Sequence, residues 1–231
     1  MKNNHFSEFI SKLSQSFIPV VSSEFSKEEY ISIDLSENNK HLESIDVSSS
    51  KAFENHITAY LNKNNAKVAY GGYNEVRGMY RRSAHFNQQD PETERNIHLG
   101  IDVWCDAETE ILAPLDGKIH SFKNNNNYGD YGPTIILEHI FNEVTFYTLY
   151  GHLTIDSLSN LKAGQNIYAG DCIAYLGDAS VNGDYAPHLH FQIIKDMQGY
   201  TGDYPGVSSK KDLDFYLQNC PDPNLLLKIY K

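Results

Sequence analysis

Apolar side chains repeat with a helical period in the N-terminal third of the chain. One repeat has three- and four-residue spacing and precedes Pro19; its members are Phe6, Phe9, Ile10, Leu13 and Phe17. A second repeat follows the serines at 48–50; its members are Phe53, Ile57, Tyr60 and Leu61. This spacing places apolar side chains on one helix face, and proline ends a helix. Between the repeats Ile31, Ile33 and Leu35 alternate and predict a short strand. We therefore expect residues 1–66 to form a small α-helical N-terminal appendage.

From about residue 67 the pattern changes to short alternating runs separated by glycine turns. Apolar and polar residues alternate over 97–103 and over 189–193, which is typical of strands with one buried face. Two more strand-like runs, 135–137 and 144–147, flank Asn142-Glu143. Asp116-Gly117 is a hairpin signal and predicts that 111–112 pairs with 118–119. For residues 67–231 we predict a mainly β fold, an antiparallel β-sheet sandwich or part-barrel.

Composition narrows the classes of partner. The formal net charge is −11, from 19 basic and 30 acidic side chains, which argues against a nucleic-acid partner because phosphate binding draws on Lys and Arg. No run of about 18 apolar residues occurs, so we expect no membrane span. The first residues lack the unbroken apolar stretch of a secretory signal, and Cys105, Cys172 and Cys220 lie far apart, as free thiols do in a reducing compartment. These features predict a cytoplasmic location, with export that needs no signal as the alternative. The sequence has no signal for an oligomeric state.

His98 and Asp102 are the first candidate metal ligands. Both occupy polar positions of the alternating segment 97–103, so in a strand they would face away from its apolar residues. In a straight strand their Cα atoms would stand about 13 Å apart, too far for one ion. Gly100 lies midway and adopts conformations that other residues avoid. A shared site therefore requires the chain to bend at Gly100.

Further histidines extend this candidate site. His188 and His190 project from the same face of a predicted strand, with Cα atoms about 6.6 Å apart, so that one can bind a metal while the other reaches its water. His152 follows another strand-like run. Each pattern alone is more often a salt bridge or a hydrogen-bonded core histidine. Together in one β-rich segment, histidine and carboxylate ligands favour a zinc site with an open position.

The motifs HxxxD (His98 to Asp102), YGHL (150–153) and HLH (188–190), in this order, resemble the lysostaphin/LytM-type zinc endopeptidases. The resemblance covers about residue 70 to the C-terminus. It implies that His98, Asp102 and His190 hold one Zn²⁺ per chain and that His152 and His188 are catalytic. It also implies hydrolysis of a peptide bond by zinc-activated water, with a peptide or muropeptide-like substrate: a peptidoglycan cross-link or a Gly-containing peptide.

A closer resemblance concerns the stretches 71–77, 95–102 and 221–227. They are similar to a peptidase-like cassette found beside class III aminotransferase domains in large bacterial chains. Wall-cutting members of the wider family often carry a tyrosine shortly before the first zinc histidine, and residues 90–96 contain none. The expected substrate-binding residues in its place are Arg95, Tyr73, Arg77 and Tyr80.

Other functions fit parts of the same pattern. A non-catalytic zinc-binding or regulatory module would share the fold, but the complete ligand set favours an enzyme. A latent enzyme would have its groove covered by the N-terminal appendage. Lipoyl carriers and phosphocarriers also use glycine-spaced β folds, but neither needs the HxxxD motif. An amidase acting on small amino-acid amides would suit the aminotransferase association. The sequence does not specify the scissile bond.

Overall fold

An eight-stranded sheet lies at the centre of the structure, a computed structural model that describes residues 4–78, 90 and 92–231. The helices are α1 (Asn4–Lys12), α2 (Ser50–Asn64), α3 (Leu213–Asn219) and α4 (Asn224–Leu227). Short 3-10 helices are η1 (Lys27–Glu29), η2 (Lys40–Ser44) and η4 (Ile155–Leu158). The strands are β1 (Tyr30–Ser32), β2 (Val68–Gly71), β3 (Arg95–His98), β4 (Ile101–Trp104), β5 (Glu110–Leu112), β6 (Gly117–Asn125), β7 (Gly132–Phe141), β8 (Val144–Gly151), β9 (Asn166–Ile167), β10 (Cys172–Tyr175), β11 (His188–Ile194) and β12 (Val207–Ser209).

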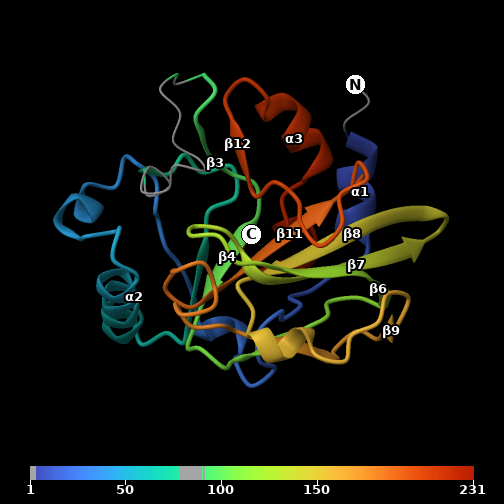
Figure 1. The fold of residues 1–231 in the computed structure, drawn as a ribbon, viewed down its shortest axis with the longest axis horizontal. Helices are drawn as coiled ribbons and strands as arrows, with labels where there is room; N and C mark the ends of the chain where they lie inside the picture. Colours follow the sequence, from blue (N-terminus) through green and yellow to red (C-terminus); the bar gives the residue numbers. More distant parts are fainter. Residues whose placement is uncertain (1–3, 79–89, 91) are drawn as a thin grey trace.

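The strand order of the main sheet is β1-β2-β4-β11-β8-β7-β6-β9 (Figure 1). The β1–β2 pair is parallel and the other pairs are antiparallel. Two small sheets, β10–β5 and β12–β3, complete the described strands. The prediction of a mainly β fold is therefore confirmed, with one large mixed sheet as its main layer.

The predicted hairpin at Asp116-Gly117 is wrong. β5 pairs with β10, whereas β6 pairs with β7 and β9. A Cβ on Gly117 would lie 2.7 Å from the Glu138 carbonyl oxygen, so this glycine permits close approach of β6 to β7. Its local sequence resembles a turn, but the close contact explains the glycine.

The β7–β8 hairpin has a two-residue turn at Asn142-Glu143, between the two strand-like runs of the sequence. Phe141 pairs with Val144, and Asn142 and Glu143 have φ values of 48° and 65°. Positive φ at both central residues matches the right-handed twist of the flanking strands.

The N-terminal third packs on the sheet and contributes to it. β1 pairs with β2, and the rings of Phe6 and Phe9 on α1 each lie 6.1 Å from that of Phe146 on β8. Figure 1 shows α2 on one flank of the molecule and α1 near β8. α1 ends at Lys12, before the end of the apolar repeat, whereas α2 covers its repeat. The domain boundary at residue 66 stays a prediction.

Alternation along the strands separates the core from a polar face. On β11, Leu189, Phe191 and Ile193 are buried in the largest apolar cluster. His188 and His190 alternate with these residues, so their side chains point to the opposite face of the sheet. On β4, Asp102 alternates in the same way with Ile101, which is buried in the apolar cluster. The histidines and the carboxylate therefore share one face of the sheet.

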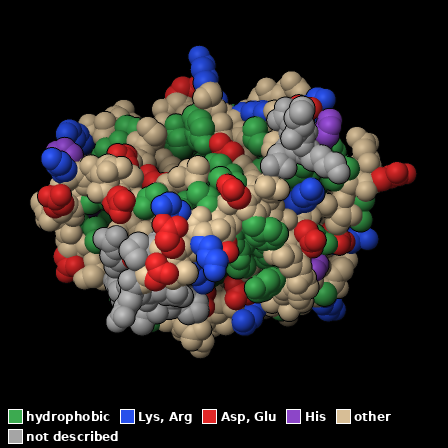
Figure 2. Space-filling view, turned by 90° about the horizontal axis from the view of Figure 1, so that it is seen from above, with side chains coloured by type: hydrophobic (Ala, Val, Ile, Leu, Met, Phe, Trp, Pro, Cys, Tyr) green, Lys and Arg blue, Asp and Glu red, His purple; other side chains and the backbone are tan. Residues whose placement is uncertain are grey.

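On the face drawn in Figure 2, basic side chains are dispersed among acidic ones. Across the described ranges, no helix combines the length and apolar character needed to cross a membrane.

Candidate metal centre

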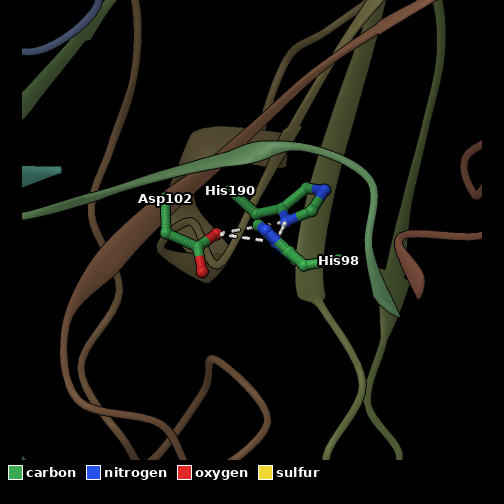
Figure 3. Close-up of side chains that lie close together, drawn as sticks. All are labelled: His98, Asp102 and His190. Carbon is green, nitrogen blue, oxygen red and sulfur yellow. Dashed lines mark hydrogen bonds and ion pairs between the residues drawn. The ribbon is translucent and has the colours of Figure 1, made fainter. Parts of the chain in front are cut away.

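Side chains of His98, Asp102 and His190 converge on one point (Figure 3). His98 Nε2 lies 2.8 Å from His190 Nδ1, and Asp102 Oδ1 lies 3.2 Å from each of these nitrogens. All three residues are at most 3% exposed. The structure thus brings together the three residues predicted to be metal ligands.

A corner at Gly100 makes this convergence possible. β3 ends at His98 and pairs with β12, whereas β4 begins at Ile101 and lies in the main sheet. The segment therefore bends between the two strands. This bend is the condition for His98 and Asp102 to share one ion. A Cβ on Gly100 would stand 2.7 Å from the His190 ring, so the position needs glycine for lack of space.

Strand pairing supplies the third side chain. On the β4–β11 ladder His190 lies directly opposite Asp102, and His188 lies opposite Trp104. Because successive strand residues face opposite sides of a sheet, this register puts both histidines on the face of the carboxylate.

Hydrogen bonds orient both ligand imidazoles. His98 Nδ1 lies 2.9 Å from the Gly72 carbonyl oxygen, and His190 Nε2 lies 2.9 Å from Gln192 Oε1. In the neutral rings these nitrogens donate to the oxygens, which leaves the lone pairs of His98 Nε2 and His190 Nδ1 pointing at each other. Two lone pairs and a carboxylate oxygen facing one point form an arrangement that a cation stabilises.

The arrangement fits a zinc-sized ion in spacing and in charge. Ligand bonds of about 2.0–2.1 Å at tetrahedral angles separate ligand atoms by roughly 3.3 Å, close to the 2.8 and 3.2 Å found here. Burial, together with the nearby Arg77, lowers the pKa of His98 to about 3, so its imidazole is neutral. Burial opposes ionisation of Asp102, but the adjacent Arg77 guanidinium outweighs it and helps to hold the Asp102 pKa well below the usual range. His98 and Asp102 therefore have the neutral imidazole and the ionised carboxylate that metal binding requires.

His152 and His188 form a second histidine pair beside the ligands. Their ring centroids lie 4.2 Å apart, and His188 Nε2 is 3.9 Å from Asp102 Oδ1. His152 Nδ1 lies 2.8 Å from the Asn182 carbonyl and His188 Nδ1 lies 2.7 Å from that of Ala186. Burial lowers both pKa values, so both rings are neutral with Nε2 as the proton acceptor.

The backbone of His152 adopts the left-handed region, with φ of 65°. Its amide donates to the Tyr131 carbonyl and its own carbonyl accepts from the amide of Gly177. Such backbone strain persists where the surroundings determine the conformation, and it is frequent at functional sites. These hydrogen bonds hold His152 in position at the end of β8.

The three candidate metal ligands and the pair His152 and His188 line a cavity of about 290 Å³. Arg77 and Arg95, two of the expected substrate-binding residues, lie among the described residues that form its wall. Tyr73 is not among them, and its hydroxyl donates to the Cys220 carbonyl. Tyr80 lies outside the described residues.

Trp104 and Tyr131 are among the aromatic residues of the cavity that were not predicted. Trp104 stacks on His188, with ring centroids 5.5 Å apart and 19° between the planes. It shares the strand parity of Asp102, and that signal could have identified it. Tyr131 Oη lies 3.5 Å from His190 Nε2, and its ring centroid lies 5.7 Å from that of His152. Nothing in the local sequence marks Tyr131, because tertiary packing brings it to the site.

Solved structures resemble the chain over about half of its length or more. The catalytic domain of the antimicrobial peptidase lysostaphin from Staphylococcus simulans is 25% identical, covering 66% of this chain and 93% of that one, with a TM-score of 0.39. A mutant catalytic domain of the prophage-encoded M23 protein EnpA from Enterococcus faecalis is 20% identical, covering 54% and 94%, with a TM-score of 0.37. TM-scores this low do not support a family assignment.

Sequence comparisons identify the family that part of the chain matches. A curated protein from Haemophilus influenzae, named "Uncharacterized metalloprotease", is 32% identical over 127 residues. The match spans 53% of this chain but only 25% of that relative's length. The model of peptidase family M23 matches residues 96–202, which contain all five site residues. The predicted resemblance to this family is thus confirmed, whereas the link to aminotransferase-fused cassettes stays a prediction. Over residues 96–202 the chain is therefore similar to the peptidases of family M23.

Proposed function

We propose that this chain is a zinc metallopeptidase that hydrolyses peptide bonds, with a peptidoglycan cross-link or a Gly-containing peptide as substrate. One observation carries the proposal: His98, Asp102 and His190 converge as a buried donor set beside the pair His152 and His188. The M23 family match supports the reaction class.

The proposed roles follow from the hydrogen bonds of each side chain. Zinc in such a site supplies Lewis-acid chemistry and activates water. His152 and His188 each have Nδ1–H committed to a backbone carbonyl, so each can accept a proton at Nε2. A neutral imidazole that accepts a proton from the attacking water can return it to the departing amine, which is general base and then general acid catalysis. Trp104 stacks on His188 and restricts its rotation.

A second candidate is an amidase that acts on small amino-acid amides. The cavity of about 290 Å³ lies at the small end of the range for ligand sites, roughly 300–1,000 Å³. A cavity of this volume accommodates a substrate as small as an amino-acid amide. The two candidates share the catalytic residues and differ only in substrate length.

The test combines metal analysis with a substrate screen. The purified chain is expected to bind one zinc ion and to cleave a member of a panel of cross-bridged peptides, muropeptides and amino-acid amides. His98→Ala and His190→Ala should lose both zinc and cleavage. His152→Ala and His188→Ala should keep zinc and lose about 10²–10⁴-fold in rate.

The control is His41→Ala, because His41 is exposed and should not affect either measurement. A wild-type chain that does not bind zinc would contradict the proposal. Full cleavage by His152→Ala and His188→Ala would show that the assigned roles are wrong. Cleavage confined to the amides would favour the second candidate.

A further inference from the structure

A buried ion-pair chain lies directly behind the metal carboxylate. The Arg77 side chain is 2% exposed, and its Nη1 lies 2.5 Å from Asp102 Oδ2. Arg77 Nε lies 2.6 Å from Glu75 Oε2, and the Glu75 side chain is 14% exposed. The guanidinium therefore joins two carboxylates.

The two oxygens of Asp102 have different partners. Oδ1 faces His98 and His190, whereas Oδ2 accepts from Arg77. A carboxylate held in this way offers a metal one oxygen rather than two. The planar guanidinium suits this role because its donors lie in a fixed fork.

The segment that carries Glu75 and Arg77 is joined to β3 by backbone hydrogen bonds. The amide of Asn74 donates to the His98 carbonyl, the amide of His98 to the Glu75 carbonyl, and the amide of Arg77 to the Asn96 carbonyl. The Gly72 carbonyl in turn accepts from His98 Nδ1. The segment thus contacts both ligands that flank Gly100.

Glu75 also links this segment to the N-terminal third. Its Oε1 accepts from the backbone amide of Leu35 at 3.1 Å, while Oε2 pairs with Arg77. A chain of polar contacts therefore leads from Leu35 through Glu75 and Arg77 to Asp102.

We propose that Glu75 and Arg77 are positioning residues that restrict Asp102 to one metal bond and balance the charge beside it. The inference rests on the proposed zinc site. Arg77 alone would place a positive charge next to the metal and weaken its binding, and Glu75 offsets that charge. The N-terminal third thereby helps to build the metal site, through the amide of Leu35.

Glu75→Gln is the most direct variant. A glutamine keeps one acceptor oxygen, so it can serve Leu35 or Arg77 but not both, and it no longer neutralises the guanidinium. Zinc affinity, measured by competition with a chelator, should fall about 10–100-fold. Arg77→Lys should also weaken binding, because a lysine does not reproduce the fork that joins the two carboxylates. The control is Glu29→Gln, since Glu29 likewise accepts a backbone amide, that of Ser26, but belongs to η1.

Coordination itself gives a second readout, which loss of stability alone does not mimic. Cobalt in the wild-type protein should show the visible spectrum of a four-coordinate site, with water in the fourth position, and X-ray absorption of the zinc-loaded wild type should show one oxygen from Asp102. In Arg77→Lys the cobalt absorption should weaken as Asp102 gains a second bond. These wild-type measurements hold even if a variant does not fold.

The outcomes separate this inference from the proposed function. If the wild type binds zinc, and folded Glu75→Gln and Arg77→Lys bind it equally tightly with an unchanged cobalt spectrum, the positioning role is wrong. A two-oxygen Asp102 in the wild type would also overturn it. If the wild type itself binds no zinc, the proposed function is wrong, and this inference with it.

Discussion

At the scale of single residues, parity and spacing identify much of the candidate site. His98 and Asp102 share a strand face, and the need for a bend at Gly100 follows from strand geometry alone. Glu75 and Tyr131 enter the site from segments whose local sequence carries no such signal. Their contacts depend on how the segments pack, which spacing along the chain does not encode.

Gly100→Ala is expected to weaken zinc binding by at least about tenfold, since it would displace a ligand. The added Cβ would meet both the His190 ring and the Phe191 carbonyl at 2.7 Å, so the ring must move. Chelator competition measures the loss. Gly78→Ala is the matched control, because a Cβ there meets no described atom within 4 Å. Equal affinities in the two variants would contradict the importance of this close approach.

At the scale of elements, alternation predicts the strands better than turn signals predict their pairing. The alternating set over 189–193 lies within β11, and the second helical repeat lies within α2. Asp116-Gly117 is misleading because a glycine required for close packing resembles a glycine required for a turn. Pairing partners lie far apart along the chain, as for β4 and β11, so a local pattern does not determine them.

Glu143→Gly is expected to stabilise the β7–β8 hairpin. Glu143 is exposed and has φ of 65°, a conformation that costs about 1–2 kcal/mol for an L-residue and that glycine adopts freely. After the greater flexibility of glycine in the unfolded chain is subtracted, a net gain of about 0.5–1 kcal/mol remains. Thermal unfolding should show a Tm higher by about 1–4 °C. Glu143→Ala should give no such rise, and a lower Tm for Glu143→Gly would contradict the argument.

At the scale of the whole molecule, buried neutral histidines make the folded state sensitive to acid. His139 on β7 is fully buried, with Nδ1 2.8 Å from the Asp116 carbonyl and Nε2 2.7 Å from Thr148 Oγ1. Burial lowers its pKa from 6.5 to about 4, although the Asp116 carbonyl opposes the shift. The burial of His139 depends on the packing of the sheet, which its local sequence does not encode.

The contribution of His139 to stability is complete above pH 6.5 and is lost as the pH falls towards 4, because the unfolded chain takes up the proton first. Between pH 7 and pH 4.5 this amounts to about 2 kcal/mol. Denaturant unfolding of the metal-free protein across this range measures it. His139→Asn should show a smaller loss of unfolding free energy than the wild type. Parallel pH profiles for the two proteins would contradict this prediction.

The geometry of the candidate site depends on strand pairing and not on the tip of the β7–β8 hairpin. His190 pairs with Asp102 on one side and with Gly151 on the other. The tip at Asn142-Glu143 adjoins Val144, and Val144 to Gly151 span about 23 Å of extended strand. Residues inserted there extend outward from the sheet and leave the register at Gly151 unchanged. For protein engineering, this makes the tip a place to attach a tag or a second domain while the donor set keeps its geometry.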